Sequence, residues 1–132
     1  MRLDHIAIWT NDLECLRNYY VKFFNGVSNE KYTNEEKEFH SYFISFDSGA
    51  RLEIMTMPTV SSNLNDTKEH QHTGLIHLAF ELDCVADVDA KAKVLIEAGF
   101  EILDGPRITG DGYYEFVTLD PDNNRVEVTA LP

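Results

Sequence analysis

The sequence has few basic residues. Lys and Arg together number 11 in 132 residues, against 23 Asp and Glu, and the formal net charge is −12. A nucleic-acid interface needs a basic stripe or patch, whereas these basic residues are scattered along the chain. We therefore expect no nucleic-acid partner. The excess of acidic side chains indicates a well-solvated surface.

Cysteine and long apolar runs are also scarce. Cys15 and Cys84 are the only cysteines and have no short metal-binding spacing, which is typical of reduced thiols in a cytoplasmic protein. No stretch approaches the roughly 20 apolar residues of a membrane span, and the first apolar run is too interrupted for a signal peptide. We expect a cytoplasmic protein without a membrane segment. Its 132 residues, of which 43% are apolar, predict one globular domain, 1–132.

The apolar pattern predicts the same succession of elements twice. In the first half we expect a strand at 2–9, a helix from Asn11 or Asp12 to Phe24, and strands at 27–33, 38–47 and 51–57. A polar stretch at 58–73 predicts a linker. In the second half we expect a strand at 74–82, a helix at 85–98, and strands at about 100–103, 113–119 and 125–130.

The two halves also match in residue detail. Leu3–Ile8 aligns with Leu75–Phe80, and Phe46–Ile54 aligns with Leu119–Val128 with one extra turn residue. An internal repeat of this kind predicts a duplicated unit. The chain is therefore predicted to be α+β, with two tandem βαβββ modules (about 1–57 and 74–132) that form a curved, barrel-like mixed sheet with the helices outside.

Strand alternation singles out two histidines and two glutamates. Side chains along a strand point to opposite faces of the sheet in turn. The apolar neighbours of these four residues can pack beneath each module's helix, as can a predicted helix face of Val88, Ala92, Leu95 and Ile96. Each half then presents one imidazole and one carboxylate on the face that its helix leaves open. The four residues are His5, Glu53, His77 and Glu127.

Two imidazoles and two carboxylates suit a divalent metal ion such as Zn²⁺, Ni²⁺, Co²⁺ or Fe²⁺. A single strand histidine is more often a satisfied polar group, and a single strand glutamate is usually solvated, but four matched positions in a repeat favour a metal site. His40, His70 and His72 are expected at the surface. A second set could line a substrate pocket or equally pack in the core; its members are Trp9, Met55, Met57, Tyr113, Tyr114 and Phe116.

The duplicated pattern, with DHIAIWTNDLE, RLEI, HLAF and LDPDNNRVEV, resembles the vicinal oxygen chelate superfamily and, within it, the glyoxalase I-like members. The resemblance implies that His5, Glu53, His77 and Glu127 hold one divalent metal, with nickel or zinc first and cobalt, iron or manganese as alternatives. It implies that Glu127, or as second choice Glu53, transfers the proton. It also implies a homodimer, in which each site is either shared between chains or formed within one.

The activity implied is that of a metal-dependent lyase or isomerase resembling glyoxalase I (lactoylglutathione lyase), acting on a hemithioacetal or a similar small oxygenated substrate. Two features depart from the glutathione-dependent pattern. Trp9 stands where that pattern has an arginine, and the asparagine that follows the fourth-strand glutamate is missing, since Glu53 is followed by Ile54-Met55-Thr56-Met57. A dioxygenase or thiol transferase and a non-catalytic small-molecule-binding or resistance protein remain alternatives. The glycine-rich segment 105–112 resembles a mobile segment over the site, or is a hairpin connection.

Overall fold

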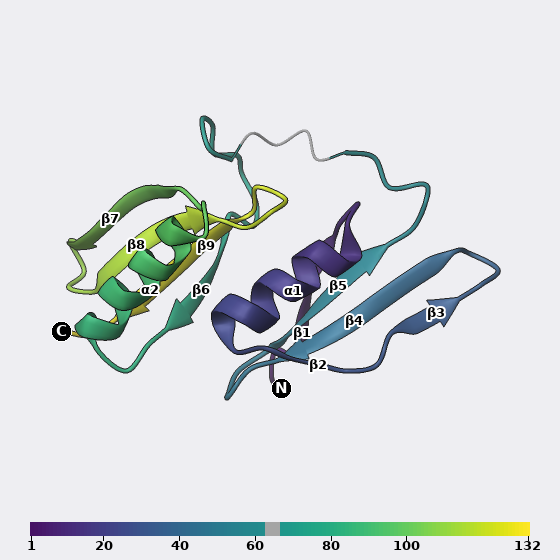
Figure 1. Cartoon of the computed structure of the whole chain (residues 1–132), viewed down its shortest axis with the longest axis horizontal. Helices are drawn as coiled ribbons and strands as arrows, with labels where there is room; N and C mark the ends of the chain where they lie inside the picture. The colour runs from purple at the N-terminus through teal and green to yellow at the C-terminus, as the bar shows by residue number, and fades with distance from the viewer. Residues whose placement is uncertain (63–66) are drawn as a thin grey trace. The chain divides into compact units, whose positions relative to one another are not determined.

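The computed structural model describes residues 1–62 and 67–132. The chain divides into two compact units, Met1–Asn63 and Leu64–Pro132, which are described separately below. The division falls within the stretch 58–73 that the sequence predicts to be a linker. Within the described residues, each unit contains one helix and one sheet (Figure 1).

The first unit contains one helix, α1 (Leu13–Phe24), and a five-stranded sheet. The sheet has the order β1-β5-β4-β2, with β3 also paired to β4. The edge strand β1 runs parallel to β5, and the other pairs are antiparallel. The strands are β1 (His5–Trp9), β2 (Val27–Ser28), β3 (Tyr32–Asn34), β4 (Phe39–Ser45) and β5 (Arg51–Thr56).

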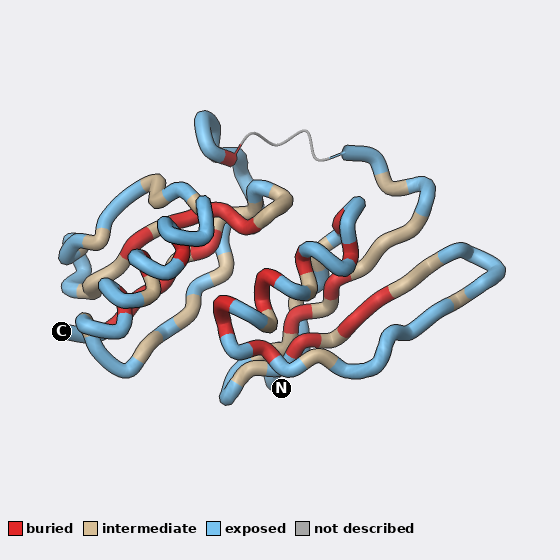
Figure 2. Tube along the Cα trace, in the orientation of Figure 1, coloured by how far each residue is buried: buried red, intermediate tan, exposed pale blue. Residues whose placement is uncertain are grey.

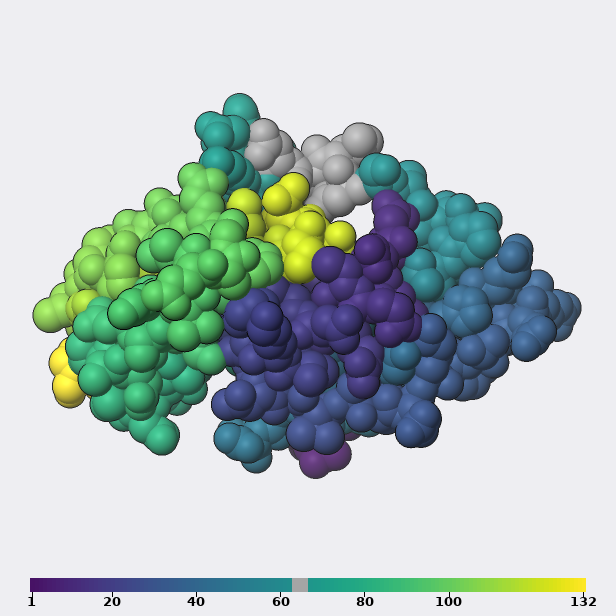
Figure 3. Space-filling view, in the orientation of Figure 1, coloured from purple at the N-terminus to yellow at the C-terminus, as the bar shows by residue number. Residues whose placement is uncertain are grey.

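The strand predicted at 27–33 is two short strands, β2 and β3, and this part of the prediction is wrong. Both pair with β4, but the register shifts by one residue between them. Asn29 lies at the break, and its side-chain oxygen accepts a hydrogen bond from the Phe43 amide at 2.8 Å. The side chain thus takes part in the pairing with β4, and the strand is interrupted. The β3–β4 hairpin projects from the edge of this unit (Figures 1 and 3).

Helix α1 begins and ends where the sequence predicts. Asp12 is the N-cap and accepts a hydrogen bond from the Cys15 amide at 3.0 Å, and Asn25 closes the helix in the left-handed conformation with φ 54°. The inner face of α1 is buried against the sheet, as the red segments of Figure 2 show. The buried core comprises Leu13, Leu16, Tyr19, Tyr20, Phe23, Phe24, Tyr42, Ile44, Leu52 and Ile54.

The second unit repeats this plan with a four-stranded sheet in the order β6-β9-β8-β7. Strand β6 runs parallel to β9, and the remaining pairs are antiparallel. The elements are β6 (His77–Glu81), α2 (Val85–Glu97), β7 (Ile102–Ile108), β8 (Tyr114–Leu119) and β9 (Arg125–Ala130). Part of the predicted linker also joins this unit, because Arg125 donates a hydrogen bond to the Thr67 carbonyl at 2.6 Å.

The predicted buried face of α2 is correct at three positions and wrong at the fourth. Val88, Ala92 and Leu95 are buried, whereas Ile96 is 57% exposed. The first three follow the spacing of one helical stripe, while Ile96 is turned about 100° away from Leu95. The buried stripe packs on β7, β8 and β9.

Strand β7 is longer than the sequence predicts. It reaches Ile108, so the first four residues of the glycine-rich segment 105–112 belong to the sheet and only the remainder connects β7 to β8. The pairing with β8 is irregular around Gly105. A Cβ atom on Gly105 would lie 2.4 Å from the Glu115 carbonyl oxygen, and φ there is +81°. Glycine therefore permits the close approach of the two strands.

The predicted α+β class and tandem βαβββ arrangement are confirmed. The two sheets are separate, and each is curved but not closed. Among the described residues, no helix has the length and apolar character needed to cross a membrane.

Candidate metal and substrate site

In the first unit, His5 and Glu53 lie on the sheet face that α1 leaves open. On β5, Leu52 and Ile54 are 3% and 0% exposed and face the helix, so Glu53 between them points the other way. Strand β1 pairs in parallel with β5, and Ala7 is opposite Glu53. His5 therefore shares the face of Glu53. The distance from His5 Nε2 to Glu53 Oε2 is 3.6 Å.

The second unit brings its own pair together in the same way. Val126 and Val128 on β9 are both 0% exposed, which turns Glu127 to the opposite face. Ala79 of β6 is opposite Glu127. The distance from His77 Nε2 to Glu127 Oε2 is 3.8 Å. The residues predicted to be metal ligands therefore form two matched His–Glu pairs, one in each unit.

Both pairs have the spacing of two ligands on one ion. With metal–ligand bonds of about 2.1 Å, neighbouring donors of a tetrahedral site are about 3.4 Å apart, close to the observed separations. In residues 1–62 and 67–132, no group of three or more His, Cys, Asp or Glu is placed to hold a metal. The convergence of all four on one ion stays a prediction.

Asp4 orients the imidazole of His5. Its carboxylate lies 2.9 Å from His5 Nδ1 and also accepts a hydrogen bond from Arg51 at 2.5 Å. These contacts, with His5 first and Arg51 second, lower the pKa of Asp4 to about 2. A carboxylate that accepts a hydrogen bond from Nδ1 leaves Nε2 unprotonated, so that Nε2 can bind a metal. Metal-binding histidines are commonly held in this way. Nε2 is the nitrogen that faces Glu53.

The rest of the open face in the first unit is aromatic and apolar. Trp9 is 42% exposed and contacts Phe39 edge-on, with ring centroids 6.0 Å apart. Met55 is opposite Trp9 in the pairing of β1 with β5. Phe43, opposite Glu53, contacts the His5 ring at 5.3 Å. Trp9 and Met55 thus lie on the same face as the His–Glu pair, and their contact with substrate stays a prediction.

Tyr114 and Phe116, also proposed for the substrate pocket, lie on the other side of their sheet. Phe116 is 0% exposed and is opposite Val128 in the β8–β9 pairing, so it faces α2. Tyr114 donates a hydrogen bond to Asp89 of α2 at 2.7 Å. The structure does not place these two side chains with Glu127.

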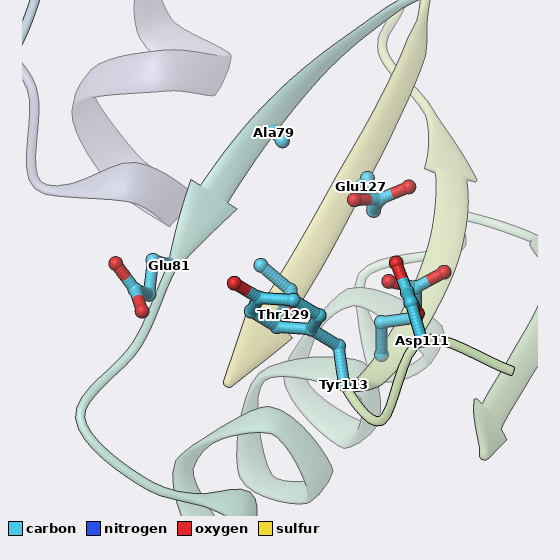
Figure 4. Close-up of a pocket in the computed structure, with 7 residues that line it drawn as sticks. Ala79, Glu81, Asp111, Tyr113, Glu127 and Thr129 are labelled. Atoms are coloured by element: carbon cyan, nitrogen blue, oxygen red, sulfur yellow. The ribbon is translucent and has the colours of Figure 1, made fainter. Parts of the chain in front are cut away.

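The second unit instead contains a pocket that the sequence analysis largely missed. Its volume is about 270 Å³, and it opens beside Glu127 (Figure 4). Strand alternation could have identified Glu81, which is two residues beyond Ala79, and likewise Glu115, which is opposite Thr129. The lining consists of Ala79, Glu81, Asp111, Tyr113, Glu115, Glu127 and Thr129.

The pocket is electrostatically negative. Burial raises the pKa of Glu115, and the nearby carboxylates of Glu127 and Asp111 raise it further, while Arg107 and His77 lower it. In the β7–β8 turn, Thr109 donates a hydrogen bond to Asp111, which lowers the pKa of that carboxyl. The turn holds Asp111 and Tyr113 at the rim, since the Thr109 amide donates to the Tyr113 carbonyl at 2.8 Å.

The other three histidines belong to neither His–Glu pair. His40, on β4, is partly buried, and its Nδ1 lies 3.1 Å from the Thr33 hydroxyl. His70 and His72 are exposed in the segment before β6.

Comparison with known proteins shows the family to which the chain belongs. Residues 2–128 match the model of the Glyoxalase/Bleomycin resistance protein/Dioxygenase superfamily. No curated protein sequence matches the chain. A solved glyoxalase family protein from Enterococcus faecalis is 22% identical with a TM-score of 0.76, and the alignment covers 97% of this chain and 96% of that one.

Two further solved structures share the fold. A glyoxylase/bleomycin resistance protein/dioxygenase domain from Frankia sp. is 16% identical with a TM-score of 0.81, covering 100% of this chain and 98% of that one. The trypanothione-dependent glyoxalase I of Leishmania major is 18% identical with a TM-score of 0.75, covering 98% and 86%.

The fold and the site define a class of protein with two βαβββ units, each carrying one His–Glu pair on its open sheet face. The chain belongs to the Glyoxalase/Bleomycin resistance protein/Dioxygenase superfamily.

Proposed function

We propose that the protein is a divalent-metal-dependent lyase or isomerase, resembling glyoxalase I, that acts on a hemithioacetal or a similar small oxygenated substrate. The observation that carries the proposal is the pair of matched His–Glu contacts, 3.6 Å in one unit and 3.8 Å in the other. All four side chains would hold a single ion, with nickel or zinc as first choice. Such an ion acts as a Lewis acid on substrate oxygens, a contribution of several kcal/mol.

Other residues of the chain would orient a ligand and transfer the proton. Asp4 and Arg51 hold His5 in the orientation that presents Nε2. Glu127 is the first choice for moving the substrate proton, because it is one of the residues that line the pocket, where a substrate can approach it. A carboxylate used in this way contributes about 10²–10⁴-fold. Glu53 is the second choice.

The proposal extends to assembly and location. We propose a homodimer in the cytoplasm, with the His5–Glu53 pair and the His77–Glu127 pair completing one site either within a chain or across the dimer. Exposed Cys15 and Cys84 are compatible with a reducing compartment.

The decisive experiment measures metal content and turnover on the same preparation. The purified protein is loaded with nickel or zinc, its metal is quantified, and methylglyoxal is offered with several thiols. We expect one ion for each set of four ligands and conversion to the thioester product. Glu127→Gln should retain the protein's fold and lose turnover, and His40→Ala serves as the matched control because His40 lies outside both pairs.

The alternatives give different results. Iron content with oxygen uptake would favour a dioxygenase. Full metal occupancy without turnover of any thiol adduct would discard the lyase assignment and keep the metal site. Small-molecule binding by a protein that takes up no metal would favour a non-catalytic binding or resistance protein.

A further inference from the structure

We propose that Arg125 is a positioning residue for His77, and that it acts through the segment 67–76, which leads into β6. Arg125 is the first residue of β9 and is opposite His77 in the parallel pairing of β6 with β9. It alternates with Glu127 along the strand, so both side chains start from the open face. The inference rests on the proposed function only in treating His77 as a metal ligand.

The guanidinium of Arg125 binds the backbone at the start of this segment. Its Nε donates to the Thr67 carbonyl at 2.6 Å, and a terminal guanidinium nitrogen donates to the Lys68 carbonyl at 3.3 Å. The two acceptors are consecutive main-chain carbonyls. A planar guanidinium has several donors in fixed directions and can bind both, whereas the single ammonium of a lysine is a point charge. Arg125 therefore holds the course of the main chain at residues 67 and 68.

Two further contacts attach the same two residues to the second unit. The Thr67 hydroxyl donates to the Asn123 carbonyl in the turn before β9, and Thr67 is only 9% exposed. Lys68 Nζ lies 2.6 Å from Glu101 Oε2, directly before β7. Residues 67 and 68 are thus attached by their carbonyl groups and by both side chains.

The segment 67–76 is a loop whose two ends meet the same residue. Arg125 binds the first carbonyls of the loop through its side chain, and through its backbone it pairs with His77, the residue that follows the loop. Opening the first contact would give this segment more conformations. His77 is also the first residue of β6, and the ends of an element open more readily than its centre. Loss of the Arg125 contacts should therefore loosen His77 first.

The first unit holds its histidine by a different contact of the matched arginine. Arg51 is opposite His5 in the pairing of β1 with β5. It donates to the Asp4 carboxylate at 2.5 Å, and this carboxylate holds the His5 ring. The residue before His77 is Ile76, whose side chain has no polar group that could hold a ring. In the second unit, the arginine instead holds the main chain that leads to the histidine.

The test follows the two imidazole rings by NMR in the metal-free full-length protein at about pH 8, where histidines are mostly neutral. Arg125→Met should move the ring signals of His77 toward those of an unstructured peptide and leave those of His5 in place. Arg51→Met is the matched variant and should move the His5 signals alone. Hydrogen exchange in Arg125→Met should become faster in residues 67–81 and stay unchanged in α2, which would show that the unit remains folded.

Milder variants keep the proposal testable if Arg125→Met does not fold. Arg125→Lys keeps the charge but lacks the planar pair of donors, and Thr67→Val removes the hydroxyl bond to Asn123 without a change in charge. Both should move the His77 signals in the same direction by a smaller amount. Lys93→Met removes one charge on the exposed face of α2 and should leave His77 unchanged. Unchanged His77 signals in the folded Arg125 variants, or an equal change in Lys93→Met, would overturn the proposal.

Metal binding distinguishes positioning of a ligand from a purely structural role. Titration with Co²⁺ should show about tenfold weaker binding in Arg125→Met than in the parent, as is typical when a group that supports a ligand is removed, together with a changed ligand-field spectrum. Faster exchange in residues 67–81 with parental affinity and spectrum would show that the Arg125 contacts are structural only, and would overturn the proposal. If the parent binds no Co²⁺, the proposed function fails, and the His77 ring signals alone decide whether Arg125 positions this side chain.

Discussion

The two units of the chain carry the same His–Glu pair in different surroundings. At matched sheet positions, the first unit has Trp9 and Met55 where the second has Glu81 and Thr129. Across the neighbouring antiparallel strand, Phe43 is opposite Glu53, whereas Val117 is opposite Glu127. One open face is therefore aromatic and apolar, and the other is acidic and hollowed into a pocket.

The comparison shows which parts of the repeat the two units have in common. The two imidazoles and two carboxylates occupy equivalent positions with nearly equal separations. The residues around them differ in charge and size, so the surroundings can serve separate parts of a substrate. If the two pairs hold one ion, as proposed, their unlike surroundings would bind an amphipathic molecule in one orientation.

The largest predicted effect tests whether the two pairs serve one ion. If they do, His5→Ala and His77→Ala should each abolish most of the metal content measured by atomic absorption, because either change removes one of four ligands. Two separate sites would instead leave about half of the metal in each variant. That result would contradict a single ion held by both pairs. His40→Ala provides the control for loss of a strand histidine.

A smaller effect is expected at the contact that only the first unit has. Asp4 holds His5 Nδ1 at 2.9 Å, while the matching residue before His77 is Ile76. Asp4→Ile copies the second unit into the first and should weaken metal binding by about 10–100-fold, as is typical when such a supporting carboxylate is removed. Asp47→Asn, at an exposed position of the same unit, controls for the lost charge. Parental metal affinity in Asp4→Ile would show that His5 needs no orienting partner.

Much of this comparison follows from strand alternation alone. The buried pairs Leu52 and Ile54, and Val126 and Val128, were enough to turn Glu53 and Glu127 to the open face. Phe116 lies in the core, which is one of the two alternatives that the sequence left open for it. It is opposite Val128, whose inward direction was already predicted, and the same reasoning would have placed Glu115 in the pocket.

Other features depend on contacts that local patterns do not encode. The break between β2 and β3 comes from the Asn29 side chain bonding the Phe43 amide, a contact 14 residues away. The irregular pairing around Gly105 depends on how closely β7 approaches β8. Whether the two His–Glu pairs meet depends on the relation between the two units, about which alternation within one strand says nothing.

The smallest predicted effect concerns the tyrosine hydrogen bond that joins the helix to the sheet in each unit. In the first, the buried Tyr42 donates to Glu14 of α1 at 3.1 Å, and Lys31 also contacts Glu14. In the second, the more exposed Tyr114 donates to Asp89 of α2 at 2.7 Å. Tyr42→Phe should lower the free energy of unfolding by about 1 kcal/mol and Tyr114→Phe by less, since solvent can replace the exposed bond. Urea unfolding of the full chain measures both, and a larger loss in Tyr114→Phe would contradict the comparison.

Acid should reduce the loss of stability caused by Tyr42→Phe. Lys31 and, after it, Tyr42 hold the pKa of Glu14 below its ordinary value of 4.5. A carboxylate with a lowered pKa stabilises the fold fully above its ordinary pKa, and this contribution is lost as the pH falls through the lowered value. The difference in stability between Tyr42→Phe and the parent should therefore be constant near neutral pH and shrink below about pH 4.5. A difference that stays constant throughout the acid range would mean that Tyr42 stabilises α1 through its ring, over which the Arg17 guanidinium lies at 5.0 Å, and not through the charge of Glu14.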